Sequence, residues 1–421
     1  MIITEHSVLP NIGSINAYER SAKYPDGYVL NSHASPYDQR FFFVWENEYC
    51  QTPCYKSTYV IGAQRIEGEE LIIKPKMENI DFMKMFSVCL TSGLSPELFS
   101  KIYSIDLDAK PIMAKTNITD ALTPLLVVHF LMLMKVITSK GLRSDYVFYN
   151  NNIRKIKGRI DIRNNERKNV MNKRFDKVYC NYSERSVNIP ENRLFKKTLL
   201  LCKRYLSKMI KHELYPELFL RINSCLGVLE GVDENVELQE IRNSKRNSLY
   251  KDYDSAVKLA LSILKRLDYS ISNDSQNCQS TPIFWIDMAL LYEHYVYGLL
   301  HKVYGSDIKY QPVGRYGWRP DFLHLGEQLI MDTKYIPTLA TDNLTGDIVG
   351  QLSGYSRVDT FANILGVDEN TIIPCLILYP IMNGDSKEFT FDRSLKLIDQ
   401  ATPCKNLRKF FKIGVPMPSL N

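Results

Sequence analysis

The sequence predicts a mixed α/β protein with a strand-rich N-terminal region, a helical middle region and a C-terminal domain built on a central mixed sheet flanked by helices. Residues 59–77 form two β-branched and aromatic runs broken at Gly68, a pattern typical of a strand hairpin. Residues 191–213 and 248–267 carry apolar residues at helical spacing. The C-terminal third places an apolar helix at 283–304, a hairpin, a helical segment at 347–365 and a very apolar strand in that order, which is typical of an α/β domain.

The N-terminal third ends in helical patterns. The segment 81–93 has a helical rhythm that stops at Gly93. The most apolar stretch, 121–137, contains Pro124 and is cut by Lys135, so we expect a buried helix and not a membrane span. The N-terminus has neither the basic start nor the apolar stretch of a signal peptide, which predicts a cytoplasmic protein without membrane contact.

The middle region predicts long amphipathic helices and a domain boundary. The helix beginning near Asn188 or Pro190 places one set of residues on a common face: Leu194, Thr198, Leu199, Cys202, Leu206 and Ile210. A polar loop at 271–282 separates this region from the C-terminal third of the chain. The sequence therefore predicts three domains: 1–140, 141–275 and 276–421.

Charge and cysteine usage restrict the function classes. The 421-residue chain has a net charge of +6, and the segment 154–177 holds ten Lys or Arg against three acids. Such a strip either neutralises phosphates or is a solvated face, and composition does not decide between them. Of nine cysteines only Cys50 and Cys54 are close together, with no second pair to complete a zinc site, so we expect reduced, partly buried thiols.

The strongest chemical signal is a Pro-Asp pair followed, after ten residues, by Asp-Thr-Lys. If the flanking strands form an antiparallel hairpin with its turn centred just after Gly326, Asp321 lies directly opposite Asp332, with Cβ atoms roughly 4.5–5.5 Å apart. Alternation along the strand then places Lys334 on the face of Asp332 and turns Thr333 away.

Two carboxylates and an ammonium group on one face suit metal-assisted phosphodiester hydrolysis. The carboxylates would hold Mg²⁺, which prefers oxygen ligands, polarises a phosphate and lowers the pKa of a bound water. Lys334 would orient that water or stabilise the developing negative charge. Asp-x-Lys alone is common, so the alternative is a surface hairpin with chance acids; the upstream Pro-Asp and the hairpin register favour the functional interpretation.

Neighbouring residues extend the expected site. Glu293 lies in the apolar helix before the hairpin, where a carboxylate needs a partner such as a metal or else an exposed helix face. Gln351 and Tyr355 share a helix face after the hairpin, either at the site or as a structural pair. His324 falls near the hairpin turn, where a structural role is the simpler interpretation. No G-x-x-x-x-G-K-[ST], G-x-S-x-G or H-E-x-x-H pattern occurs, which argues against nucleotide hydrolysis through a P-loop and against those hydrolase types.

These patterns resemble a known family. RPDF followed by MDTKY resembles the PD-(D/E)xK nuclease superfamily, and QLSGY is similar to the Q-x-x-x-Y element of its RecB-like branch. Four ordered blocks resemble the McrC family, the nuclease subunit of McrBC restriction systems: YVIGAQRIEGEELIIKPKM, IKGRIDIRNN, SVNIPENRLFKKTL and ALLYEHYVYGLL. Thr333 stands where the family often has alanine, Asn188 stands where an acid is frequent, and the first 58 residues match no block.

The resemblance implies an endonuclease subunit that takes part in defence against foreign DNA. Asp321, Asp332 and Lys334 would be catalytic. The place of Glu293 in an apolar helix predicts, apart from the resemblance, that it holds Mg²⁺ together with Asp321 and Asp332. The partners would be double-stranded DNA and an McrB-like AAA+ GTPase ring, which would bind the GTP, while residues 1–140 would dock on the ring and stimulate its GTPase. Its charge predicts, apart from the resemblance, that the basic strip either contacts phosphates through Lys155, Lys157 and Arg159 or has a structural role beside the DNA.

Two alternatives stay open. The chain could be a self-sufficient PD-(D/E)xK nuclease of the repair or recombination type, or a non-catalytic activator of a ring NTPase whose nuclease fold is inactive. Whether the target carries modified cytosine cannot be assigned from this chain, because McrC-like subunits also occur beside partners that recognise unmodified sites.

Overall fold

The structure is a computed structural model that describes residues 2–7, 43–46, 54–66, 69–106, 110, 112–113, 117–209, 215–242, 251–272, 280–341, 344–368, 371–382 and 389–420. The chain divides into two compact units, one of Met1–His129 with Ser270–Asn421 and one of Phe130–Tyr269. The expected domains 1–140 and 276–421 therefore fall largely within the same unit, and the expected middle region corresponds closely to the other.

The N-terminal part of the first unit is built on a five-stranded sheet. Its strands, in spatial order, are β1 (Ile2–Thr4), β5 (Glu69–Lys74), β4 (Val60–Ile66), β12 (Ile283–Asp287) and β6 (Tyr103–Asp106). Strands β4 and β5 form an antiparallel hairpin, as predicted, and β1 pairs with β5 in parallel. Two short ladders accompany this sheet: β2 (Phe43–Glu46) with β3 (Cys54–Ser57), and β7 (Ile112–Met113) with β11 (Ser280–Thr281).

Strand β12 corrects one prediction. The apolar helix was expected to begin at Ile283, whereas Ile283–Asp287 is a strand between β4 and β6, and helix α9 (Met288–Tyr304) begins only after it. Gly62 makes this pairing possible, because a Cβ atom there would lie 2.1 Å from the carbonyl oxygen of Phe284. Asp287 then caps the helix by accepting a hydrogen bond from the Leu290 amide at 3.0 Å.

The helices of this part follow the predicted apolar patterns. Helix α1 (Phe82–Thr91) ends before Gly93, and α2 (Pro96–Ser100) follows it. Helix α3 (Asn117–Lys140) passes from the first unit into the second. By length and composition Ala121–Lys140 could cross a membrane, but 83% of its most apolar window is buried inside the protein, as a core helix requires.

The C-terminal part of the first unit is built on a six-stranded mixed sheet. Its spatial order is β13 (Ile308–Tyr310), β14 (Phe322–His324), β15 (Leu329–Thr333), β16 (Cys375–Met382), β18 (Phe410–Met417) and β17 (Thr402–Pro403). The first three strands are antiparallel, whereas β15, β16 and β18 run parallel. Short helical segments flank these strands: Gly305–Asp307, Arg315–Gly317, Pro337–Thr341 and α12 (Leu397–Gln400).

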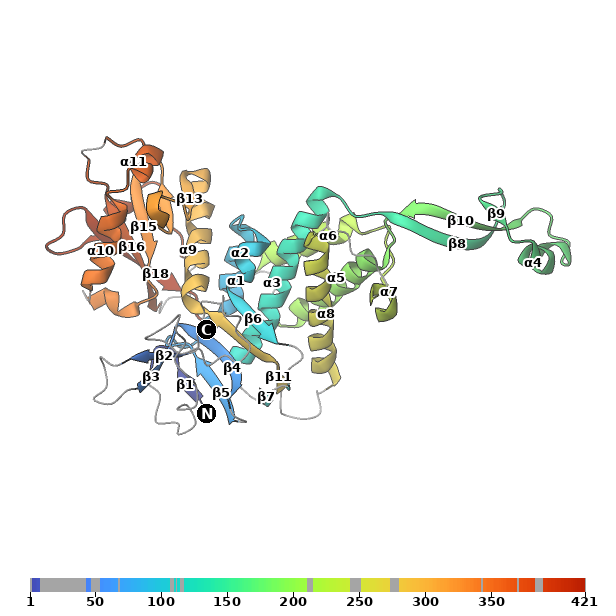
Figure 1. The fold of residues 1–421 in the computed structure, drawn as a ribbon, viewed down its shortest axis with the longest axis horizontal. Helices are drawn as coiled ribbons and strands as arrows, with labels where there is room; N and C mark the ends of the chain where they lie inside the picture. The colour runs from blue at the N-terminus through green and yellow to red at the C-terminus, as the bar shows by residue number, and fades with distance from the viewer. Residues whose placement is uncertain are drawn as a thin grey trace. The chain divides into compact units, whose positions relative to one another are not determined.

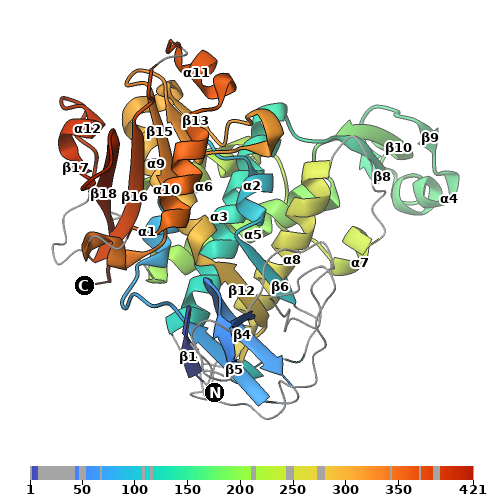
Figure 2. The same ribbon diagram turned by 60° about the vertical axis from the view of Figure 1, so that its left-hand side comes forward.

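Helices cover both faces of this sheet (Figures 1 and 2). Helix α9 packs on one face, where Tyr297 stacks on Phe322 of β14. The other face forms an apolar core with α10 (Gly346–Tyr355) and α11 (Asp359–Leu365). These two helices replace the single helical segment expected at 347–365. The arrangement confirms the predicted mixed sheet flanked by helices.

The second unit combines a helical bundle with a long β ladder. Its helices are α5 (Pro190–Met209), α6 (Pro216–Val228), α7 (Leu238–Arg242) and α8 (Lys251–Ser272). The ladder pairs β8 (Asp145–Ile153) with β10 (Val178–Ser186) and carries β9 (Arg159–Ile160), α4 (Ile162–Asn165) and a π-helical turn (Glu166–Val170) at its far end. Figure 1 shows the ladder extending away from α5, α6 and α8.

Within this unit the predicted helix face is confirmed. Helix α5 begins at Pro190, and the expected face is buried at every described position: Leu194, Thr198, Leu199, Cys202 and Leu206. Ile210 lies outside the described residues. Six described cysteines are free and buried, in agreement with the expectation of reduced thiols: Cys89, Cys180, Cys202, Cys225, Cys375 and Cys404. The Cys50–Cys54 spacing falls where the structure describes no side chains.

Candidate functional site

The β14–β15 hairpin has the register expected from the sequence. Phe322 pairs with Met331, and His324 pairs with Leu329 across the turn. One step beyond the first pair, this register places Asp321 opposite Asp332. Asp332 is only 2% exposed, so one of the two acids is fully enclosed in the protein.

Lys334 connects the acids to helix α10. Its ammonium group forms an ion pair with Asp332 and donates a hydrogen bond to Oε1 of Gln351 at 2.9 Å. The Gln351 amide in turn donates to the hydroxyl of Tyr355 at 2.7 Å. The structure thus brings Lys334, Gln351 and Tyr355 into one continuous chain of polar contacts that starts at Asp332.

Thr333 differs from the prediction, which turned it away from the acids. Its amide and its hydroxyl both donate to Oδ2 of Asp321, at 2.6 and 2.5 Å. Asp321 directly precedes β14, and its carboxylate reaches Thr333, the half-buried last residue of β15. Thr333 is therefore a contact residue of the site, and strict strand alternation could not reveal this because it does not describe side chains beyond a strand end.

Glu293 of α9 reaches the same place through Gln311. The Gln311 side-chain amide donates to Oε1 of Glu293 at 2.8 Å, and its backbone amide donates to the Asp321 carbonyl at 2.7 Å. Gln311 has a φ of 41°, a left-handed conformation that costs a non-glycine residue energy. No sequence pattern marked Gln311; its only signal was its position directly after a strand.

Burial raises the pKa of all three carboxyl groups. Burial, followed by the charge of Asp332, raises the pKa of Glu293 to about 7. Burial and the charges of Asp332 and Glu293 raise the pKa of Asp321 well above its usual value. Burial also raises the pKa of Asp332, although Lys334 opposes that shift. Three ionised acids at this place therefore require more positive charge than Lys334 supplies.

The donor set fits Mg²⁺ in an open site. All three candidate ligands are carboxylates, the donors that Mg²⁺ prefers. Among the described residues, no group of three or more His, Cys, Asp or Glu side chains forms a ready metal cluster. In the usual Mg²⁺ site, one or two carboxylates are completed by waters and substrate phosphates. Asp321 and Asp332 would be those ligands, with Glu293 beside them.

His324 lies away from the acids. It occupies the turn end of the hairpin, where its Nδ1 accepts a hydrogen bond from the Glu327 amide at 3.2 Å and its ring contacts Tyr304. Burial lowers the pKa of His324, so the neutral ring is favoured. These contacts support the structural role expected from the sequence.

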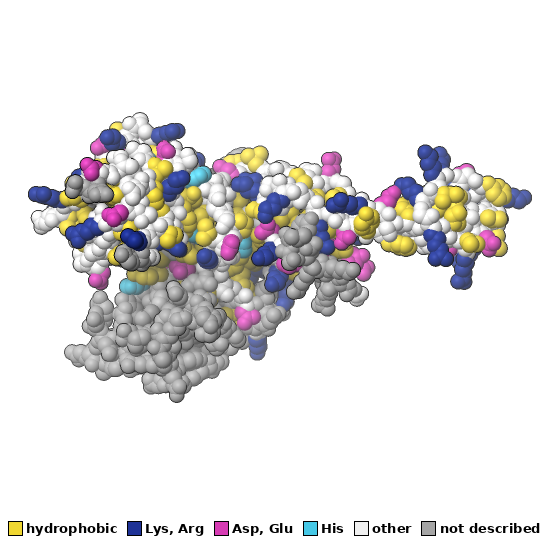
Figure 3. All heavy atoms as spheres, turned by 45° about the horizontal axis from the view of Figure 1, so that its top comes forward, with side chains coloured by type: hydrophobic (Ala, Val, Ile, Leu, Met, Phe, Trp, Pro, Cys, Tyr) yellow, Lys and Arg dark blue, Asp and Glu magenta, His cyan; other side chains and the backbone are white. Residues whose placement is uncertain are grey.

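The basic residues predicted to contact DNA lie in the second unit, at the far end of the β8–β10 ladder. Lys155, Lys157 and Arg159 are all exposed, and Lys157 pairs with Glu184 at 2.5 Å. Figure 3 shows Lys and Arg side chains together with hydrophobic ones on this part of the molecule. These basic residues belong to the second unit, whereas the acids belong to the first.

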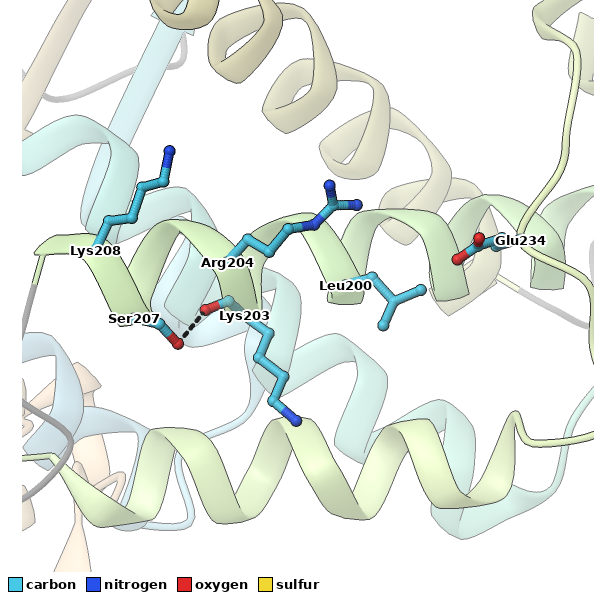
Figure 4. A pocket seen from close by; sticks show the side chains of 6 residues that line it. All are labelled: Leu200, Lys203, Arg204, Ser207, Lys208 and Glu234. Atoms are coloured by element: carbon cyan, nitrogen blue, oxygen red, sulfur yellow. Dashed lines mark hydrogen bonds between the residues drawn. The ribbon is translucent and has the colours of Figure 1, made fainter.

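A pocket of about 500 Å³ lies elsewhere in the second unit, along helix α5 (Figure 4). Its lining combines one acid with three basic residues and two others: Glu234, Lys203, Arg204, Lys208, Leu200 and Ser207. Lys203 is engaged by Asn223 at 2.9 Å, and no nucleophile–base pair is found among these lining residues. The pocket is therefore lined by basic side chains that form no recognisable catalytic arrangement.

Comparison with known proteins supplies the family. The family model of the McrBC 5-methylcytosine restriction system component matches residues 56–343. A chain from the refined half-complex of the tetradecameric assembly of Thermococcus gammatolerans McrB AAA+ hexamers with bound McrC is 14% identical, with a TM-score of 0.37 over 100% of this chain and 95% of that one. A chain of the Thermococcus gammatolerans McrBC complex is 13% identical, with a TM-score of 0.31 over 71% and 86%. No curated protein matches the sequence. Because the family model covers more than half of the sequence, the chain belongs to the McrBC 5-methylcytosine restriction system components, in agreement with its resemblance to McrC.

Proposed function

We propose that this chain is the Mg²⁺-dependent endonuclease subunit of an McrBC-like restriction system and cuts double-stranded DNA together with an McrB-like AAA+ GTPase. The observation that carries the proposal is the pair of opposed acids, Asp321 and Asp332, with Lys334 in contact with Asp332. A surface hairpin with chance acids would not also gather Glu293 and Thr333 around the same carboxylates.

Each residue has a distinct task in phosphodiester hydrolysis. Asp321 and Asp332, with Glu293 beside them, would hold Mg²⁺, which when bound polarises the scissile phosphate and lowers the pKa of a water. Lys334 would turn its ammonium group toward the attacked phosphate and stabilise the developing charge. Gln351, itself held by Tyr355, orients that ammonium group, and Thr333 holds Asp321 in place.

The partner is inferred from the family and from the missing nucleotide motif. A component of the McrBC system without a P-loop needs another subunit to hydrolyse GTP. We assign docking and GTPase stimulation to residues 1–140. The ladder of the second unit is a further candidate surface, because large apolar side chains are exposed along it: Tyr146, Phe148, Ile156, Ile160, Ile162, Val170, Met171 and Phe175. Exposed apolar groups in such number are typical of protein contacts.

The test is cleavage by the complete complex. Purified chain, a candidate AAA+ partner, GTP and Mg²⁺ would be mixed with DNA carrying methylated or unmethylated cytosine. We expect cleavage with the wild-type chain, and loss of about three orders of magnitude or more with Asp332→Ala, because one ligand and the partner of Lys334 are removed. Asp347→Ala is the matched control, since Asp347 is an exposed acid in the first turn of α10.

The other outcomes identify the alternatives. Cleavage by the chain alone, without partner or GTP, would establish a self-sufficient nuclease. Faster GTP hydrolysis by the partner without any cleavage would establish a non-catalytic activator. Full cleavage by Asp332→Ala would contradict the proposed active site whichever partner is used.

A further inference from the structure

A largely buried polar cluster links the N-terminal sheet to the segment that follows β15 and carries Lys334. Its members are Glu5, Lys76 and Tyr335, which belong to the same compact unit. Glu5 directly follows β1, Lys76 follows β5, and Tyr335 is the residue after Lys334. Since β1 and β5 are parallel neighbours, their C-terminal ends lie together, which is why Glu5 and Lys76 meet.

The contacts converge on Tyr335 from two directions. The Lys76 ammonium group donates to the backbone carbonyl of Tyr335 at 2.5 Å and lies 3.9 Å from the centroid of its ring. The Tyr335 hydroxyl donates to Oε1 of Glu5 at 2.9 Å. The Lys76 backbone amide donates to the same oxygen, also at 2.9 Å. Both the backbone and the side chain of Tyr335 are therefore held by the N-terminal sheet.

Lys334 depends on this anchoring because it stands one residue beyond the end of β15. Its amide still donates to the Leu378 carbonyl of β16 at 2.9 Å, but its own carbonyl accepts from Ile336 in a tight turn. The backbone thus leaves the sheet at the residue that contacts Asp332. A shift of the following peptide would move the Lys334 side chain, and displacements of about 1 Å cost catalysis as much as ~100-fold.

The burial of this cluster argues against a simple packing role. Glu5 is 2% exposed and Tyr335 is 4% exposed, and Oε2 of Glu5 has no hydrogen-bond partner among the described residues. Burial raises the pKa of Glu5 to about 7 and lowers that of Lys76 to about 8, which shows that the charged forms are disfavoured. Replacing a buried ionic pair by apolar residues of similar volume is often neutral or stabilising, so this cluster is better explained by the geometry that it imposes.

We propose that Glu5 and Lys76 are positioning residues for the nuclease reaction, holding Tyr335 so that Lys334 stays between Asp332 and Gln351. This inference rests on the proposed function. It also gives the N-terminal sheet a direct physical connection to the reaction centre, so that displacement of β1 or β5 would act on Lys334 through two hydrogen bonds to one residue.

The test compares Lys76→Met with Lys74→Met in the full chain with its partner. Methionine keeps most of the length of the side chain but removes its charge and its donors, and Lys74 is an exposed lysine two residues earlier, at the end of β5. We expect Lys76→Met to lower kcat for DNA cleavage about 10- to 100-fold with little change in KM, whereas Lys74→Met behaves as wild type. An unchanged kcat in Lys76→Met would overturn the inference.

Hydrogen exchange separates positioning from unfolding. Faster amide exchange in Lys76→Met confined to residues 329–338, with the β4–β5 hairpin as protected as in wild type, is the expected result. Acceleration throughout β4 and β5 would show a merely structural role and overturn the inference. If Lys76→Met fails to fold, Tyr335→Phe, which loses only the bond to Glu5, is measured in the same way. The exchange pattern is readable even if the wild-type complex cuts no DNA, so failure of the proposed function remains distinguishable.

Discussion

At the scale of single residues, Gln311 should set the Mg²⁺ requirement of the reaction. Gln311→Gly removes the hydrogen bond to Glu293 while accommodating the left-handed backbone without steric cost. We expect the Mg²⁺ concentration for half-maximal cleavage to rise roughly tenfold or more, as is usual when a residue that orients a metal ligand is lost. The thermal unfolding midpoint should change little.

Gln328→Gly is the matched control for that substitution. Gln328 also has a left-handed backbone, with a φ of 56°, but it lies at the turn of the hairpin. Its side-chain amide donates to the backbone carbonyls of Leu365 and Gly366. The same chemical change there should leave the Mg²⁺ requirement unaltered. An equal rise in both variants would show that the effect comes from hairpin stability and not from Glu293.

The residues of the site differ in whether short-range sequence patterns could predict them. Asp321, Asp332 and Lys334 could be found because hairpin register and strand alternation are short-range rules. Thr333 and Gln311 could not, because each acts at or just beyond a strand end, where the backbone leaves regular geometry. Tyr335 was missed for a different reason: its partners, Glu5 and Lys76, are hundreds of residues away in the sequence.

At the scale of elements, the β8–β10 ladder permits a test of DNA contact by its basic residues. Replacing Lys155, Lys157 and Arg159 together with alanine should flatten the dependence of log Kobs for DNA on log salt concentration. The slope should fall by at most about 2.7, since each phosphate contact contributes about 0.9. Filter binding or fluorescence anisotropy at several salt concentrations measures this directly.

The pocket on α5 provides the control of equal charge. Alanine at Lys203, Arg204 and Lys208 changes the net charge by the same amount at a different place in the same unit. We expect the salt slope of that variant to match wild type. Equal slopes in wild type and both triple variants would show that the strip at 154–177 is a solvated face without a nucleic-acid partner.

This ladder also shows why some elements escaped prediction. Strand β8 is exposed or half-buried along its whole length, so no alternation of apolar and polar residues marks it. Its stability comes from nine paired positions with β10, a long-range feature that no local pattern contains. Helix α5, in contrast, buries one continuous face against its own unit, and its sequence pattern predicted it correctly.

At the scale of the whole molecule, segments that are far apart in the sequence belong to the same compact unit. Strand β12 inserts between β4 and β6, so residues on both sides of the helical middle region build one sheet. The six-stranded C-terminal sheet therefore follows directly, through α9, from a strand of the N-terminal sheet. The polar stretch 271–282 begins just after the second unit ends at Tyr269, but composition alone cannot show that the chain returns to an earlier sheet.

The buried acids of that unit predict how pH and Mg²⁺ together set stability. An acid whose pKa is raised on folding stabilises the protein below its unfolded pKa, and this contribution is lost as pH rises through the folded value. For Glu293 that window runs from the ordinary pKa of 4.5 to about 7, and the pKa values of Asp321 and Asp332 shift in the same direction. Without metal, the free energy of unfolding should therefore fall across this range.

Mg²⁺ should reverse that loss, because it binds the ionised carboxylates and neutralises their repulsion. We expect Mg²⁺ to raise the thermal midpoint by several degrees at about pH 8 and far less at about pH 5, where protons compete with the metal. Differential scanning fluorimetry with Mg²⁺ or a chelator at each pH measures the difference. Asp332→Asn should abolish most of the gain at high pH.

Since the pKa of Glu5 is also raised but Glu5 lies outside the acid site, Glu5→Gln should alter the metal-free pH dependence and leave the Mg²⁺ gain intact. A gain that is equal at both pH values, or that survives in Asp332→Asn, would place the metal elsewhere.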